Sequence, residues 1–224
     1  WILFLKWLDD YEIEKEKKSS LDNKVYIPLI EEKFRWSSWA VIKNNDGTIN
    51  YNKSLTGQDL KKLVDDKVFP YLSSFKDKAA SINSLEYKIG EIFFEIKNKI
   101  EDGYSLREII NEVDKLDFRS NKQKYELSFL YEEKIKRMGN AGRNGGEYYT
   151  PRALIRSMIR IINPKIGETI YDGAVGSAGF LVEAFEYIKN SKTLTTSELK
   201  ILETQTLYGA EKKSLAYTIG IMNM

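Results

Sequence analysis

The sequence of 224 residues contains neither cysteine nor histidine. The absence of cysteine excludes disulfide bonds and thiolate metal sites. The absence of histidine excludes imidazole metal ligands and an imidazole general base. We therefore expect a protein whose chemistry uses no metal. Proline is also scarce, with four residues, so helices can run with few interruptions.

The sequence also lacks a long hydrophobic run. Its apolar start, WILFLKWLDD, is interrupted by Lys6, Asp9 and Asp10 and lacks the basic start and cleavage site of a signal peptide. No stretch approaches the roughly 20 apolar residues that a membrane span needs. We therefore expect a cytoplasmic protein with no membrane partner.

The sequence also lacks a marked excess of positive or negative charge. The formal net charge is +2, so a nucleic-acid site would have to be a local basic patch. Hydrophobic residues make up 42% and charged residues 30% of the chain, a balance typical of a globular protein with a sizeable core.

The first part of the chain is patterned as helices, with apolar residues at three- and four-residue spacing. Residues 12–24 are charged and carry serine and asparagine, which predicts a connection, and Asp46-Gly47 predicts a turn. The Ser-Leu-Arg-Glu sequence from Ser105 predicts a helix start. We interpret residues 1–138 as a helical N-terminal domain. Its predicted helices are residues 56–69, 84–100, 105–113 and 122–138.

The pattern changes at Gly139. Residues 139–146, GNAGRNGG, hold four glycines in eight positions and cannot form a helix interior, so we expect a linker. From Pro151 onward helices and strands alternate, which is typical of a doubly wound α/β sheet. We interpret residues 147–224 as the first part of such a domain. After its first helix, the predicted elements are a strand at 168–172, a turn at 172–179, a helix at 180–188, a helix at 197–203, a strand at 206–211 and a helix at 212–224.

The segment DGAVGSAG, which begins at Asp172, follows the first predicted strand. Glycines at Gly173, Gly176 and Gly179 let the backbone approach a ligand closely, and the next helix presents its N-terminal amides there. The spacing differs from the G-x-G-x-x-G of dinucleotide sites, which weakens a nicotinamide-dependent reading. An ordinary strand-to-helix turn is the alternative.

Glu211 ends the second predicted strand, where an acidic residue can accept hydrogen bonds from ribose hydroxyls. The alternative is a solvated side chain beside Lys212 and Lys213. Just before the first α/β helix stands GEYYTPR, in which Thr150 is a good N-cap and Pro151 suits the next position. That segment alone could be a helix start with two packed tyrosines.

These segments together resemble the modification (methylase) subunits of type I restriction-modification systems, within the adenine-N6 DNA methyltransferases. The stretch GEYYTPRALIRSMIRIINPKIGETIYDGAVGSAGFLVEAF is similar to two cofactor motifs of that family, and LYGAEKKSLAYTIGIMNM to its following segment. The resemblance implies an all-helical N-terminal domain joined to the truncated first part of a Rossmann-like class I methyltransferase domain. The implied cofactor is S-adenosyl-L-methionine.

The resemblance also implies site residues. The residues that would close over the cofactor are Glu147, Tyr148, Tyr149, Thr150, Pro151 and Arg152. The residues that would form the tight turn and hold the amino-acid part of the cofactor are Asp172, Ser177, Ala178 and Gly179. Glu211 would accept the two ribose hydroxyls.

The family's catalytic Asn-Pro-Pro-aromatic segment does not occur in this sequence. In the family that segment holds the target adenine, flipped out of the duplex, against the methyl donor. We therefore expect no catalytic residue in this chain and no methylation of DNA by it alone. The start at Trp1 and the end at Met224 within a predicted helix suggest a fragment of a longer subunit.

The resemblance implies partners as well: double-stranded DNA, a specificity subunit, a restriction subunit and a second copy of the methylase subunit. Two alternatives of other classes stay open. One is a non-catalytic helical scaffold with a vestigial cofactor fold, and the other is a nicotinamide-dependent oxidoreductase. The DNA target sequence would reside in another polypeptide.

Overall fold

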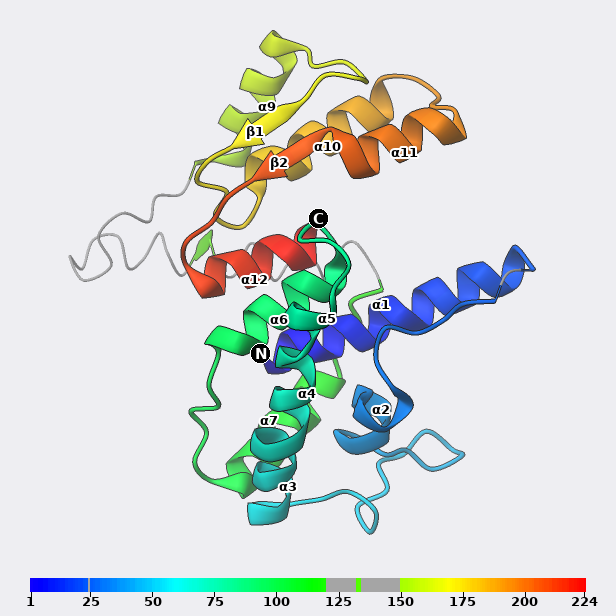
Figure 1. Ribbon diagram of the computed structural model, residues 1–224, viewed down its shortest axis with the longest axis vertical. Helices are drawn as coiled ribbons and strands as arrows, with labels where there is room; N and C mark the ends of the chain where they lie inside the picture. Colours follow the sequence, from blue (N-terminus) through cyan, green and yellow to red (C-terminus); the bar gives the residue numbers. More distant parts are fainter. Residues whose placement is uncertain (24, 120–131, 134–149) are drawn as a thin grey trace, which may run out of the picture. The chain divides into compact units, whose positions relative to one another are not determined.

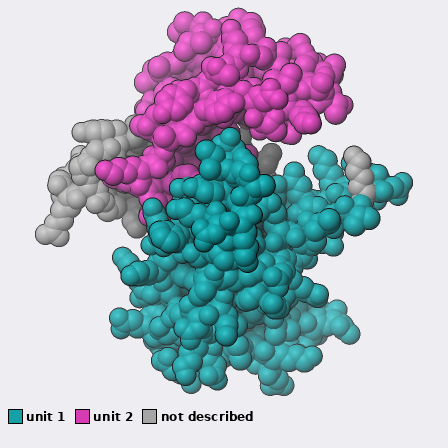
Figure 2. Space-filling view, in the orientation of Figure 1, with its two compact units in different colours: residues 1–123 teal, residues 124–224 magenta. Residues whose placement is uncertain are grey.

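The computed structural model describes residues 1–23, 25–119, 132–133 and 150–224, whose helices and strands are labelled in Figure 1. They belong to two compact units, Trp1–Gln123 and Lys124–Met224, which Figure 2 colours separately. The predicted linker at 139–146, and most of the predicted helix before it, lie outside the described residues.

The first unit is helical wherever the structure describes regular elements, apart from an isolated antiparallel bridge between Lys43 and Ile49. That bridge flanks the predicted turn, where Gly47 has a φ of 84°, a left-handed conformation that suits glycine. The helical elements of this unit are α1 (Ile2–Leu21), the 3-10 helix η1 (Glu32–Phe34), α2 (Trp36–Trp39), α3 (Gly57–Leu63), the π-helical segment η2 (Val64–Val68), α4 (Phe69–Ser73), α5 (Phe75–Lys78), α6 (Leu85–Glu95) and α7 (Gly103–Asp114). In the described part of the chain, no helix is both long and apolar enough to cross a membrane.

Three sequence predictions for this unit are wrong. Residues 12–21 continue α1 instead of forming a connection, because their glutamates and lysines are good helix formers that extend a helix already begun. The helix predicted to reach residue 100 ends at Glu95, where the backbone becomes extended. Helix α7 begins two residues before Ser105, because the side chain of Asp102 caps it by accepting the Ser105 amide at 2.7 Å.

Aromatic and aliphatic side chains form the core of the helical unit. Phe4 and Leu8 of α1 are almost completely buried. Phe93 of α6 packs edge-on against Phe69 at 5.2 Å between ring centroids and lies 6.0 Å from Phe4. Such ring contacts stabilise a core beyond the apolar area that they bury. They join α1, α4 and α6 into one hydrophobic interior.

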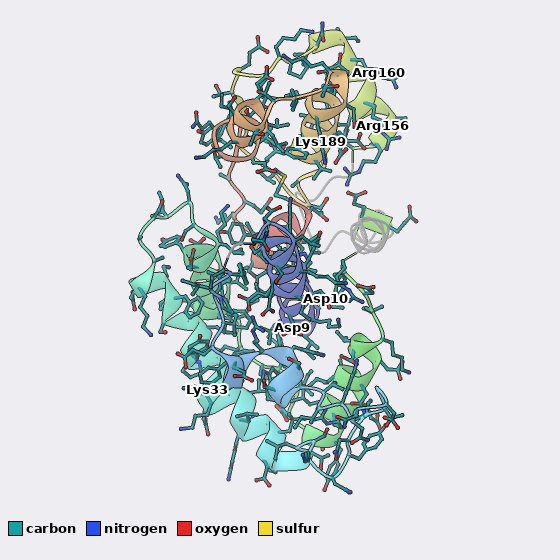
Figure 3. The ribbon with its side chains drawn as sticks, turned by 90° about the vertical axis from the view of Figure 1, so that its right-hand side faces the viewer. Asp9, Asp10, Lys33, Arg156, Arg160 and Lys189 are labelled. Atoms are coloured by element: carbon teal, nitrogen blue, oxygen red, sulfur yellow. The ribbon has the colours of Figure 1, made fainter. Side chains whose placement is uncertain are left out.

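Helix α1 also buries charged side chains. Lys6 Nζ lies 2.6 Å from Asp10 Oδ1, and Asp10 Oδ2 accepts the Phe118 amide at 2.9 Å. Figure 3 labels Asp9 and Asp10, which are neighbouring residues of α1. Burial raises the pKa of Asp9 to about 6, against the opposing effect of Lys6 and Arg35. The ionised Asp9 carboxylate therefore destabilises the fold near neutral pH.

The second unit joins two parallel strands to helices. Its elements are α9 (Arg152–Ile162), β1 (Ile170–Asp172), α10 (Gly179–Ser191), α11 (Thr196–Gln205), β2 (Leu207–Gly209) and α12 (Ser214–Asn223). The strands pair in parallel, with Ile170 opposite Leu207 and Asp172 opposite Gly209. Both strands lie within the ranges that the sequence predicts and are shorter. A parallel connection of this length, carrying two helices, is the βαβ arrangement of α/β proteins.

One face of the two-stranded sheet is covered by α9 and α10. Ile155 and Ile159 of α9 pack with Ala184 of α10, and the strand residues Ile170 and Leu207 pack against this cluster. Alternate residues of a strand point to opposite faces. Tyr171 and Tyr208, which are paired across the strands, accordingly are exposed.

Gly209 at the end of β2 permits a close approach of the segment that follows β1. A Cβ atom placed on Gly209 would lie 2.1 Å from Val175 Cγ2, 3.1 Å from the Asp172 carbonyl oxygen and 3.2 Å from Leu181 Cδ1. Side chains in such a crowded place cannot be enlarged without moving their neighbours. The glycine therefore sets how closely the two strand ends and α10 pack.

Replacing Asp9 by Asn is expected to raise the free energy of unfolding of the full chain at pH 7.5 by about 2 kcal/mol. A raised native pKa means that the stabilising proton is held fully below about pH 4 and is lost as the pH rises through 6. The advantage of Asp9→Asn should therefore vanish near pH 4. Urea unfolding at a series of pH values measures it, with Glu14→Gln on the exposed part of α1 as the control. Equal stability of Asp9→Asn and wild type at pH 7.5 would contradict the prediction.

Replacing Gly209 by Ala is expected to lower the free energy of unfolding by about 1–3 kcal/mol, because the new methyl group displaces Val175 and the backbone beside it. The matched control is Gly173→Ala, whose Cβ would meet only the Tyr171 ring, at 3.4 Å. Urea unfolding of the full chain compares the two variants. A Gly209→Ala protein as stable as the Gly173→Ala protein would show that the packing adjusts freely.

Candidate functional site

The segment between β1 and α10 is a tight strand-to-helix bend. Strand β1 ends at Asp172 and α10 begins at Gly179, so the predicted turn at 172–179 is observed. Gly176 and Ala178 both have left-handed backbone conformations, with φ values of 56° and 65°. The Asp172 carboxylate accepts the Ala174 amide at 3.0 Å and so fixes the first residues of the turn.

The loop that leaves β2 runs beside this turn. Ala210 donates its amide to the Asp172 carbonyl at 2.9 Å, and its own carbonyl accepts the Val175 amide at 3.1 Å. Because the two strands are parallel, their carboxyl ends lie at one edge, where α/β sheets bind ligands. The two backbone bonds extend that pairing beyond the strands.

Glu211 reaches from the second loop into the turn. Its Oε2 accepts the Gly176 amide at 2.7 Å and its Oε1 accepts the Lys213 amide at 2.8 Å. The side chain is half-buried, so it differs from the freely solvated strand-end residue considered as an alternative. A carboxylate offers about four lone-pair positions, so each oxygen retains capacity for another donor.

Helix α10 contributes its N-terminus to the same place. The first amides of a helix have no acceptor within the helix, and together with the helix dipole they favour a negatively charged group. Asn223 at the end of α12 donates its side-chain amide to the Ser177 carbonyl at 2.7 Å and thereby ties α12 to the turn. The Glu211 carboxylate and the N-terminus of α10 thus both adjoin the turn at residues 172–179.

The start of α9 differs from the sequence prediction by one position. Thr150 does not cap the helix: Pro151 occupies the N-cap position, and no side chain caps the first turn. Arg152 follows, and its two terminal nitrogens donate to the Gly179 carbonyl at 3.2 Å and to Glu132 Oε1 at 2.6 Å. The structure thereby brings Arg152 to the glycine turn.

Several residues singled out by the sequence cannot be placed. Glu147, Tyr148 and Tyr149 lie outside the described residues. Glu132 was missed, because a glutamate in the charged sequence LYEEKIKRM carries no signal that separates it from its solvated neighbours. Ser177 Oγ donates to Glu132 Oε1 at 2.9 Å, and this contact and the Arg152 ion pair, both tertiary, distinguish Glu132 from its neighbours.

A groove of about 520 Å³ lies between α9 and α10, away from the turn. It contains side chains of both signs, including Arg156 and Arg160 of α9 and Glu183 of α10. Figure 3 labels Arg156, Arg160 and Lys189 on these two helices. The ion pair between Arg156 and Glu183, at 2.9 Å, leaves no uniformly basic surface there. Among the described residues, no group of three or more acidic side chains is arranged to hold a metal ion.

Comparison with known proteins assigns the chain to a family. Residues 122–224 match the family model described as N-6 DNA Methylase. The chain is 36% identical, over its whole length, to the type I restriction enzyme EcoEI methylase subunit of Escherichia coli, and it covers 42% of that protein.

Two solved structures are also similar over the whole chain. One is a modification subunit of a putative type I restriction enzyme from Vibrio vulnificus YJ016, with 32% identity, a TM-score of 0.80 and 46% of that chain covered. The other comes from a study of complex assembly and conformational transition of the type I R-M system, with 30% identity, a TM-score of 0.68 and 42% of that chain covered. The chain thus spans less than half the length of these relatives, and it belongs to the N-6 DNA methylase family, among the methylase subunits of type I restriction enzymes.

Proposed function

We propose that the chain is the first part of an S-adenosyl-L-methionine-dependent DNA adenine-N6 methyltransferase subunit of a type I restriction-modification system. The observation that carries the proposal is the hydrogen bond between the Glu211 carboxylate and the Gly176 amide. It joins an acceptor suited to ribose hydroxyls to a turn suited to the amino-acid end of the same ligand. Family membership supports the methyl-transfer chemistry.

The described residues fit the proposed cofactor. The open space around Gly176, where an added Cβ would meet nothing within 4 Å, leaves room for a ligand against the backbone. The N-terminus of α10 suits the ligand's carboxylate, and Glu211 retains acceptor capacity for two hydroxyls. When bound, the cofactor supplies a methyl group on a sulfonium. This chain's own residues bind and orient that group, with Asp172 and Ser177–Gly179 shaping the turn.

The roles proposed for Glu147, Tyr148, Tyr149, Thr150, Pro151 and Arg152 are to cover the bound cofactor and exclude water. The Asn-Pro-Pro-aromatic segment that would hold the adenine does not occur in these 224 residues. Because the chain spans less than half the length of its relatives, we propose that the remainder of the subunit supplies it. A downstream coding sequence without that segment would instead favour the non-catalytic scaffold.

The helical unit is proposed to contact other components of the assembly. The similar structure from a study of type I complex assembly supports this role, since it matches the chain over its whole length. The proposed partners are double-stranded DNA, a specificity subunit that reads the target sequence, a restriction subunit and a second methylase subunit.

Calorimetric titration of the full chain with S-adenosyl-L-methionine tests the proposal. We expect binding by the wild type and a loss of about 10- to 100-fold in affinity for Glu211→Gln, because two hydrogen bonds to a charged acceptor are weakened. The control is Glu203→Gln on the exposed side of α11, which should bind as the wild type does. No heat with S-adenosyl-L-methionine, or preferential binding of NAD, would refute the proposal.

A further inference from the structure

Glu132 is a buried carboxylate that receives hydrogen bonds from two separate segments. Its exposed fraction is 8%, and its Oε1 accepts both Arg152, at 2.6 Å, and the Ser177 hydroxyl, at 2.9 Å. Burying a carboxylate is costly unless a cation and hydrogen-bond donors compensate it. Arg152 supplies the cation and Ser177 a hydrogen-bond donor, so Glu132, Arg152 and Ser177 form one connected polar network.

The network touches the glycine turn at two points. Ser177 belongs to the turn itself, and Arg152 donates from its other terminal nitrogen to the carbonyl of Gly179, the first residue of α10. The Arg152 side chain is 20% exposed, so water screens this ion pair only partly. Glu132 therefore restrains the turn directly through Ser177 and indirectly through Arg152.

Ala178, which lies between Ser177 and Gly179, needs such restraint. Ala178 has a φ of 65° and is completely buried, although an L-residue with a Cβ disfavours the left-handed region. A conformation of this kind persists only when its surroundings over-determine it. The two contacts flank Ala178 and hold the direction of the amides that precede α10.

We propose that Glu132 is a positioning residue that keeps Ser177–Gly179 in the conformation that binds the amino-acid part of the cofactor. The inference rests on the proposed function and assigns to that site a residue outside its sequence motifs. Because Arg152 is neutralised by Glu132, the ligand's carboxylate is recognised by the turn amides and the α10 N-terminus. The ribose end depends on Glu211, which the network does not contact.

The test uses two ligands that share adenosine and differ in the amino-acid part. S-adenosylhomocysteine carries that part and methylthioadenosine lacks it. We expect Glu132→Gln to weaken binding of S-adenosylhomocysteine to the full chain by about 10-fold and to change methylthioadenosine binding by less than about 2-fold. Ser177→Ala removes one of the two contacts, so a smaller loss with the same selectivity, about 3-fold, is expected.

The matched control is Arg156→Gln, which removes an ion pair from the same helix at a position 59% exposed. It should leave both affinities unchanged. A Glu132→Gln protein that loses both ligands equally would overturn the inference, because general loosening of the fold does not discriminate between them. Unchanged S-adenosylhomocysteine affinity in Glu132→Gln and Ser177→Ala would overturn it too.

Two further results keep the test decisive. If Glu132→Gln does not fold, Ser177→Ala decides the outcome alone, since it removes a hydroxyl and leaves the Glu132 carboxylate paired with Arg152. If the wild type binds neither ligand, the proposed function itself fails, and that result differs from loss of selectivity in the variants. Thermal unfolding of each variant, measured beside the titrations, verifies that the titrated protein is folded.

Discussion

The parallel pairing of β1 with β2 is the constraint on which the candidate site depends. Each strand has only three residues, yet their register places Asp172 opposite Gly209 and sends both following loops from one edge. Gly176 and Glu211 are 35 positions apart in the chain, and they meet because of this pairing. Backbone hydrogen bonds through Ala210 continue the contact past the last strand residue, so the two loops stay paired beyond the strands.

Close packing around the turn follows from that pairing. Gly209 leaves just enough space for Val175, and the left-handed Ala178 directs the chain into α10. Both features cost conformational free energy that the surrounding contacts offset. Side chains from three other segments supply these contacts: Glu132, Arg152 and Asn223. The turn is therefore defined by tertiary interactions as much as by its glycines.

The helical unit buries charged side chains together with its hydrophobic core. Helix α1 places aromatic and charged side chains in one interior, where Lys6 pairs with Asp10, and Asp10 and Glu12 accept backbone amides. Removing one partner of such a pair would leave an uncompensated buried charge, which costs more than the pair itself contributes. The pKa of Asp9 is raised mainly because its carboxyl group is buried in this interior. The family model matches residues 122–224, so it covers almost none of this helical unit.

Local sequence determined the two strands, the glycine turn and the helix after it, because turn chemistry and apolar periodicity act over a few residues. It also marked Asp172 and Glu211, since both stand at the ends of the predicted strands, although β2 itself ends at Gly209. Only the tertiary structure decided that α1 continues through residues 12–21, that Asp102 caps α7, and that Glu132 joins Arg152 to Ser177. These features depend on which distant side chain satisfies a helix end or a buried charge. Such pairings have no period in the sequence, because the energy that selects them arises only once the chain has folded.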